Sequence, residues 1–186
     1  MLSDRDIAQE LSYGELKVEP VNLDEQLQPC SLDVRVGDEC GFYNVPNGVI
    51  VDTRETDVEK YIERRNINED GLVVGPDDFF LVSTRENISI PDYLGVEIKG
   101  RSSMARLAVS IHQTGGLSDA GFGGGLVLEV STESDFPVRI YPGQRIAQLT
   151  FHRLQTAAKE PYGKENGNKY DGQQGAVGSR IHEDNV

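Results

Sequence analysis

The chain has 186 residues, of which 31 are Asp or Glu and 18 are Lys or Arg, so its formal net charge at pH 7 is -13. This acidity disfavours DNA or RNA as a partner, because binding to phosphate backbones depends on clustered Lys and Arg side chains. No stretch approaches the ~20 consecutive apolar residues of a membrane-spanning helix, and no basic and apolar leader is recognisable. We therefore expect a cytoplasmic protein that binds neither nucleic acid nor a membrane.

The first predicted element is an amino-terminal helix over residues 3–13. Ser3 can cap its first turn, Leu2 and Ile7 have the spacing of a hydrophobic staple, and Gly14 is a suitable stop. A half-buried strand is predicted next, over residues 30–36. Its apolar residues alternate with polar ones and are Cys30, Leu32, Val34 and Val36.

Beyond this strand, the charged stretch at 58–62 suits either a short amphipathic helix or an exposed loop. From Gly75 onward the pattern is almost entirely strand, interrupted by turn residues. The predicted strands cover residues 79–83, 87–90, 94–99, 107–112, 125–131, 138–141 and 145–151. Many short strands at regular spacing favour an all-β barrel or sandwich, with minor helices, in one domain over 1–186. The tail, residues 161–186, is polar and rich in Gly, and by itself it buries too little to become ordered.

The cysteines and histidines do not suggest a zinc site. Cys30 and Cys40 are too few for a disulfide framework and lack CxxC spacing, so we expect a reducing compartment. His112, His152 and His182 are scattered, which leaves no plausible tetrahedral ligand set. We interpret His112 as a packed residue of its strand.

The segment Gly100–Arg106, GRSSMAR, groups two hydroxyls and two guanidiniums within one strand-to-turn stretch. Backbone amides and Ser hydroxyls donate to phosphate oxygens, and Arg adds forked donors with a permanent positive charge. The segment therefore suits a polyphosphate. A polar turn with two surface arginines is the alternative, because no established phosphate-loop pattern is present.

A glycine-rich stretch, which ends at residues 123–125, leads into a strand that contains Glu129. Alternation puts Leu126, Leu128 and Val130 on one face of this strand, so Glu129 projects from the other. The carboxylate is either solvated or part of a site. The glycines favour a site, because they allow a ligand to approach the backbone closely.

Five segments, in this order, resemble the dCTP deaminase family of the trimeric dUTPase superfamily. They are QPCSLDVRVG at 28–37, GRSSMAR at 100–106, HQTGGLSDAGF to LVLEV at 112–130, PGQRIAQLTF at 142–151, and KY with QQGA within 169–176. The resemblance implies a distorted β-barrel and a homotrimer with active sites at subunit interfaces. It also implies that dCTP binds with Mg2+ on its triphosphate. The H-x-E and P-C-x-x-C patterns of zinc deaminases do not occur.

The resemblance also implies roles for individual residues. Glu129 matches the catalytic glutamate, which would transfer protons between the attacking water, N3 of cytosine and the leaving amine. Asp119 matches an aspartate near the deoxyribose 3′-hydroxyl, although a turn aspartate is the alternative. Further substrate contacts are implied for Arg101, Ser102, Ser103, Met104, Ala105, Arg106, Val127, Leu128, Gln148, Tyr162, Lys169 and Gln173. The last three lie in the tail, which we expect to order over bound nucleotide and exclude water; a disordered tail without function is the alternative.

Members of this family either release dUTP or cleave it further to dUMP and diphosphate, which supplies dUMP for thymidylate synthesis. The former resemble a pattern with a bulky His-Arg pair after Thr-Ala, and the latter resemble AGF or AGW. Gly116 and Leu117 leave room for a second water at the α-phosphate, and with Gln148 they favour the dUMP-forming type. Against it, Leu117 replaces the aromatic residue, Gly115 replaces Ala, and the QQGA tail is shared with enzymes that stop at dUTP. A monofunctional deaminase, a dUTPase and a non-catalytic nucleotide-binding homologue are the alternatives.

Overall fold

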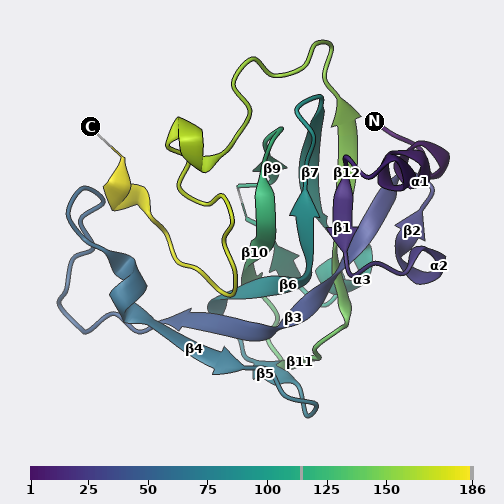
Figure 1. Ribbon diagram of the computed structural model, residues 1–186. Helices are drawn as coiled ribbons and strands as arrows, with labels where there is room; N and C mark the ends of the chain where they lie inside the picture. Colours follow the sequence, from purple (N-terminus) through teal and green to yellow (C-terminus); the bar gives the residue numbers. More distant parts are fainter. Residues whose placement is uncertain (114, 185–186) are drawn as a thin grey trace.

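The computed structural model describes residues 1–113 and 115–184, so Thr114 and residues 185–186 of the predicted tail lie outside the described part. Within it, ten strands form one antiparallel sheet that curls into a half-barrel (Figure 1). The strand order is β8-β10-β6-β3-β12-β7-β9, with β1 paired to β6, and with β2 and β4 paired to β3. A separate pair is formed by β5 and β11. The prediction of a mostly β fold with minor helices is confirmed.

The strands are β1 Lys17–Glu19, β2 Leu27–Gln28, β3 Ser31–Tyr43, β4 Ile62–Asn66, β5 Leu72–Val74, β6 Phe79–Ser89, β7 Leu94–Gly100, β8 Val109–Ile111, β9 Leu117–Ser118, β10 Gly123–Thr132, β11 Val138–Ile140 and β12 Arg145–Arg153. The α-helices are α1 Asp4–Tyr13, α2 Leu23–Gln26 and α3 Ser102–Ala105. The 3-10 helices are η1 Val58–Tyr61, η2 Lys164–Asn166 and η3 Ile181–Glu183.

The amino-terminal helix has the predicted caps. The Ser3 hydroxyl accepts a hydrogen bond from the Asp6 amide, and the Asp6 carboxylate accepts one from the Ser3 amide at 3.0 Å. Gly14 ends the helix in the left-handed conformation, with φ of 80°. Ile7 is fully buried, so the apolar face of α1 covers one end of the curled sheet.

The long strand β3 connects the two halves of the curled sheet. Its first part pairs with β12, from Leu32 to Arg35, and its second part pairs with β6, from Val36 to Gly41. The register shifts just after Val36. At this point a Cβ on Gly37 would lie 2.8 Å from the Ser83 carbonyl oxygen, so only glycine allows the two backbones to approach so closely.

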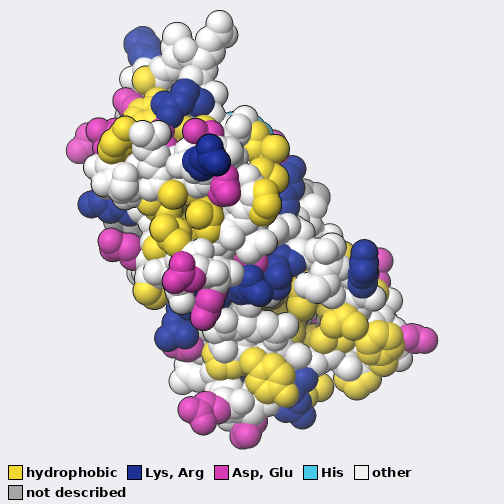
Figure 2. All heavy atoms as spheres, turned by 90° about the vertical axis from the view of Figure 1, so that its right-hand side faces the viewer, with side chains coloured by type: hydrophobic (Ala, Val, Ile, Leu, Met, Phe, Trp, Pro, Cys, Tyr) yellow, Lys and Arg dark blue, Asp and Glu magenta, His cyan; other side chains and the backbone are white. Residues whose placement is uncertain are grey.

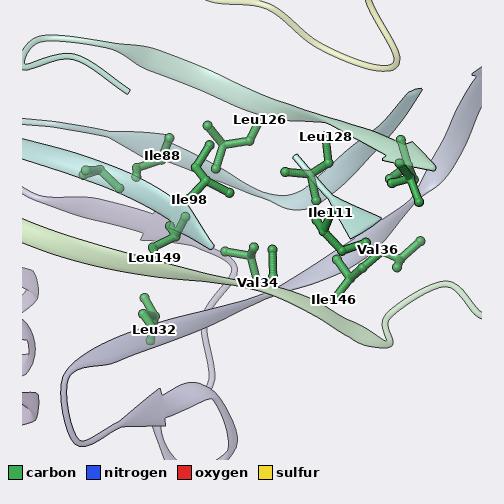
Figure 3. Close-up of a cluster of buried hydrophobic side chains, with 14 of the residues drawn as sticks. Leu32, Val34, Val36, Ile88, Ile98, Ile111, Leu126, Leu128, Ile146 and Leu149 are labelled. Carbon is green, nitrogen blue, oxygen red and sulfur yellow. The ribbon is translucent and has the colours of Figure 1, made fainter. Parts of the chain in front are cut away.

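The core fills the inside of the half-barrel, as Figure 3 shows. Leu32, Val34 and Val36 of β3 and Leu126 and Leu128 of β10 belong to this core, and each is at most 4% exposed. The apolar faces predicted for these two strands are therefore confirmed. Cys30 is an exception, because it precedes β3 and is exposed. The prediction that the strand at 30–36 is half-buried was wrong, because Ser31 and Asp33 on its polar face are buried as well.

Several predicted boundaries were wrong. The two strands expected at 79–83 and 87–90 are one continuous strand, β6. The strand expected at 107–112 is shortened to β8, since His112 has a φ of 62° and leaves the extended conformation. Ser102–Ala105, expected in a strand-to-turn stretch, form the helical turn α3. The charged stretch at 58–62 contains the 3-10 helix η1.

The described part of the tail, residues 161–184, packs against β10. The Gly125 amide donates to the Gln173 carbonyl at 2.9 Å, and the Gly172 amide donates to the Gly123 carbonyl at 2.6 Å. A Cβ on Gly124 would lie 3.0 Å from the Gln173 amide nitrogen, so this approach depends on glycine. Figure 1 shows the tail, in yellow, running on to the segment that joins β3 to β4.

The opposite side of the molecule, with α1 and α2, is shown in Figure 2. Basic and acidic side chains alternate there with patches of hydrophobic ones. The charge on this face is therefore mixed, and the face has no uniformly basic stripe of the kind that binds nucleic acid.

Candidate active site

Glu129 projects from β10 into a cavity with a volume of about 840 Å³. Its side chain is 34% exposed, whereas the neighbouring Leu128 and Val130 are fully buried on the other face of the strand. The sequence pattern therefore predicted the orientation of Glu129 correctly. This volume falls within the range of about 300–1,000 Å³ that is usual for small-molecule sites.

The imidazole of His112 lies directly against Glu129. Its Nδ1 is 2.8 Å from Oε2 of Glu129, and its Nε2 is 2.7 Å from the carbonyl oxygen of Gly115. Neither of these two buried atoms forms a hydrogen bond with a described residue, so the contact acts as an ion pair when the imidazole is charged. The backbone amide of His112 also donates to the Glu129 carbonyl at 2.7 Å.

These contacts favour a charged histidine. Burial of the imidazole acts against the charged form, but the Glu129 carboxylate and the Gly115 carbonyl outweigh it and raise the pKa of His112 above its ordinary value of 6.5. Only the charged ring can form an ion pair with the Glu129 carboxylate. His112 therefore belongs to the candidate site. Its side chain is only 5% exposed, so the interpretation of a packed residue is confirmed, but its placement within the strand was wrong, because β8 ends at Ile111.

The cavity brings together residues that are far apart in the sequence. The predicted site residues on its wall are Asp119, Val127, Glu129, Tyr162, Lys169 and Gln173, together with Leu117 of the predicted product-determining pair. Aromatic residues Tyr43, Phe79, Phe122 and Tyr170 also line it. The wall thus combines apolar ring surfaces with carboxylate, amide and ammonium groups, which suits a polar aromatic ligand.

The tail residues on this wall are held by other protein groups. The Tyr162 ring packs on Phe122 with centroids 5.7 Å apart. The side-chain amide of Gln173 donates to the Gly125 carbonyl at 2.9 Å, and the Lys169 ammonium group pairs with the Asp184 carboxylate at 2.6 Å. A nucleotide phosphate at Lys169 would therefore have to displace Asp184 or share the ammonium group with it.

The segment Arg101–Arg106 lies apart from this cavity, and none of its residues lines the wall. Ser102, Ser103, Ala105 and Arg106 are exposed, and Met104 is buried. Arg101 instead pairs with Asp33, with its Nε 3.3 Å from Oδ2 of that carboxylate. Within one chain, the predicted substrate-binding residues therefore form two separate clusters.

Asp33 organises the second cluster. Its side chain is fully buried, and it also accepts hydrogen bonds from Arg145 and from the Gln148 amide, each at 3.2 Å. Gln148 also donates to the Ser31 hydroxyl at 3.2 Å. The alternation of 30–36 assigned Asp33 to the polar face of its strand, which gave no indication of these buried contacts.

The other predicted residues differ in burial and in their distance from the cavity. Val127 reaches the cavity, but Leu128 is buried in the core, so only its backbone is available to a ligand. Leu117 is 64% exposed. Gly116 accepts a hydrogen bond from the Ile98 amide at 2.7 Å, and a Cβ on it would lie 3.2 Å from the Ile98 carbonyl oxygen.

Two further findings concern the described residues only. Among residues 1–113 and 115–184, no group of three or more His, Cys, Asp or Glu side chains is placed to hold a metal ion. No helix in this part of the chain is long and apolar enough to cross a membrane. The Mg2+ implied by the resemblance would be bound by the nucleotide.

Comparison with known proteins identifies the family of this chain. A sequence model of the family described as dCTP deaminase-like matches residues 1–154, which include both clusters except for their tail residues. The chain belongs to the dCTP deaminase-like family. It is 44% identical to a dCTP deaminase of Haloarcula marismortui, over 99% of this chain and 96% of that protein. It is also 41% identical to a dUMP-forming dCTP deaminase of Halobacterium salinarum, over 99% of this chain and 96% of that protein.

The fold of this dCTP deaminase-like chain is also found in a solved structure. The crystal structure of a 2′-deoxycytidine 5′-triphosphate deaminase from Agrobacterium tumefaciens superposes with a TM-score of 0.64 at 24% identity. The match covers 82% of this chain and 47% of that one. This likeness supports the curled, mostly β architecture.

Proposed function

We propose that this protein catalyses the hydrolytic deamination of dCTP, with Glu129 as the general acid–base. Water adds to C4 of the cytosine ring, and Glu129 takes a proton from that water. Protons then pass to N3 and to the amine, the C4–N bond breaks, and ammonia leaves. The product is dUTP, and Mg2+ enters and leaves as part of the nucleotide.

The observation that carries this proposal is the Glu129 carboxylate on the wall of a nucleotide-sized cavity, in a member of the dCTP deaminase-like family. A charged His112 would hold one carboxylate oxygen in place and leave the other for the attacking water. Apolar residues such as Leu81 and Val127, next to Glu129 on this wall, would exclude bulk water from the pyrimidine ring.

We also infer that the dUTP is cleaved in the same site to dUMP and diphosphate. Relatives named as dUMP-forming have 36–41% identity and relatives named only as dCTP deaminase have 41–44%, so their names do not decide the product. Support comes instead from Gly116. A Cβ at this position would lie 3.2 Å from the Ile98 carbonyl oxygen, so glycine allows this segment to approach β7 closely, next to Leu117 on the cavity wall. The lack of a bulky pair at 116 and 117 would leave space for a second water at the α-phosphate.

The separation of the two residue clusters supports an active site shared between subunits. One subunit would supply Glu129 and its cavity, and a neighbour in a homotrimer would supply Arg101, Ser102 and Arg106 for the triphosphate. The exposed side chains of Ser102 and Arg106 are available to such a neighbour. In a cyclic oligomer each interface would contain one complete site.

One product assay tests both parts of the proposal. Purified protein is incubated with dCTP and Mg2+, and ammonia, dUTP and dUMP are separated over time. We expect ammonia and dUMP to appear together, with little free dUTP. Release of dUTP alone would reject the cleavage step, and absence of ammonia would reject the deaminase. A parallel incubation with dUTP alone tests for a simple dUTPase, which would form dUMP from dUTP but release no ammonia from dCTP.

A further inference from the structure

Side chains of β3 and η1 hold the far end of the tail. Oε1 of Glu39 accepts a hydrogen bond from the Ala176 amide at 2.7 Å, and Oε2 of Glu59 accepts one from the Gly178 amide at 2.8 Å. The Tyr43 hydroxyl accepts a third hydrogen bond, from the Ser179 amide, at 3.3 Å. Hydrogen bonds from amides to carboxylates are stronger than those to neutral acceptors.

Arg64 on β4 joins the two carboxylates. Its Nε lies 3.7 Å from Oε1 of Glu39, and its terminal nitrogen pairs with Oε1 of Glu59. These three side chains are 33% to 39% exposed, so the ion pairs by themselves contribute little to stability. Their effect is geometric, because the guanidinium orients the oxygens that accept the tail amides.

The docked segment, residues 175–178, has the sequence Gly-Ala-Val-Gly and lies close to both carboxylates. Gly175 has a left-handed φ of 71°, which favours glycine, and a Cβ on Gly178 would lie 2.9 Å from Oε2 of Glu59. Ala176 is fully buried. The surface formed by Glu39 and Glu59 is therefore shaped for this segment of the tail.

The docked tail is also a wall of the cavity that contains Glu129. Residues 177–179 line the cavity, and so do Lys169 and Tyr170 earlier in the tail. Arg180 links the two parts, because its amide donates to the Tyr170 hydroxyl at 2.9 Å and its side chain donates to the Lys169 carbonyl. Release of the docked segment would therefore displace Lys169 and Tyr170 as well.

We propose that Glu39 and Glu59, joined by Arg64, are positioning residues for the reaction at Glu129, because they anchor the tail and so hold the cavity wall that bears Lys169. The inference rests on the proposed function, since it connects tail docking with nucleotide binding. Because the anchor consists of protein groups, the proposal includes docking of the tail before nucleotide binds.

The first test follows the tail by limited trypsin digestion without nucleotide, because Lys169 and Arg180 are cleavage points in it. In the double variant Glu39→Ala/Glu59→Ala, we expect cleavage at these points to be about tenfold faster than in the wild type. The matched control is Glu63→Ala. Glu63 lies on β4, next to Arg64, and its carboxylate pairs with Arg65 at 2.9 Å. This exposed carboxylate takes no part in the anchor, so cleavage should stay within about twofold of the wild type.

The second test measures dCTP kinetics on the same variants. We expect the double variant to raise KM about tenfold while kcat falls less than about threefold, and Arg64→Gln to have a smaller effect in the same direction. Wild-type cleavage rates in the double variant would overturn the anchor. Faster cleavage with unchanged KM would overturn the positioning role.

If the double variant does not fold, the single variant Glu59→Ala takes its place, because Glu59 lies on a short 3-10 helix and its side chain is 35% exposed. Cleavage that rises throughout the chain, rather than after Lys169 and Arg180, would then overturn the proposal. If the wild type does not deaminate dCTP, the kinetic test fails together with the proposed function. The digestion still decides whether Glu39 and Glu59 hold the tail.

Discussion

Subunit mixing tests whether two chains share each active site. The structure separates Glu129, on the cavity wall, from Arg106, which is exposed in the other cluster. We therefore expect Glu129→Gln and Arg106→Gln, each nearly inactive alone, to complement each other when their subunits are mixed. Glu129→Gln removes the proton acceptor, and loss of general acid–base catalysis commonly costs about 10²–10⁴ in rate.

The size of the effect follows from the cyclic symmetry. In a random equal mixture, a site is complete when its Glu129 comes from an Arg106→Gln subunit and its Arg106 comes from a Glu129→Gln neighbour. Each condition is met half of the time, so about one quarter of wild-type activity should return. A mixture of wild type with the double variant Glu129→Gln/Arg106→Gln should also retain about one quarter if sites are shared, and about one half if each chain has its own site.

The assay is ammonia release after the variants are co-expressed with two different tags. A mixture of wild type with Glu129→Gln alone is the control, since about one half of the activity is expected under either arrangement. Mixtures of the two single variants that are no more active than the separate proteins would refute the shared site. The two residue clusters would then need another explanation.

Further expected outcomes concern the chemistry itself. Glu129→Gln should stop ammonia release while dCTP binding, measured by calorimetry, stays nearly intact; near-wild-type deamination would reject Glu129 as the base. Replacement of Gly116 by His together with Leu117 by Arg should leave deamination in place while dUTP accumulates, which chromatography of the products would show. Activity should survive exhaustive zinc chelation once Mg2+ is restored, and recovery only with added zinc would contradict this. Because the folded-state pKa of His112 is raised, the stability that its charged form provides is complete below about pH 6.5 and is lost as pH rises through the folded-state pKa. Urea unfolding should therefore show a loss of stability over this range that His112→Asn reduces, and an equal loss in the variant would count against the His112–Glu129 ion pair.

Local patterns in the sequence determined much of this protein. The capping residue Ser3 and the stop at Gly14 predicted α1, and the alternation around Glu129 predicted which face of β10 it occupies. The five family-like segments led to the dCTP deaminase-like family. These predictions succeed because capping and strand alternation depend on residues a few positions apart.

The tertiary structure decided which distant residues meet. His112 reaches Glu129 because β8 and β10 pair with Ile111 opposite Val130, and no local pattern specifies that register. The partners of the buried Asp33 lie more than 60 residues away in the chain, and the anchor of the tail likewise joins Glu39 to Ala176. The separation of Glu129 from the Arg101–Arg106 segment is likewise set by the tertiary structure. All of these features depend on the pairing and docking of segments that are distant in the sequence. The pattern of neighbouring residues does not specify them.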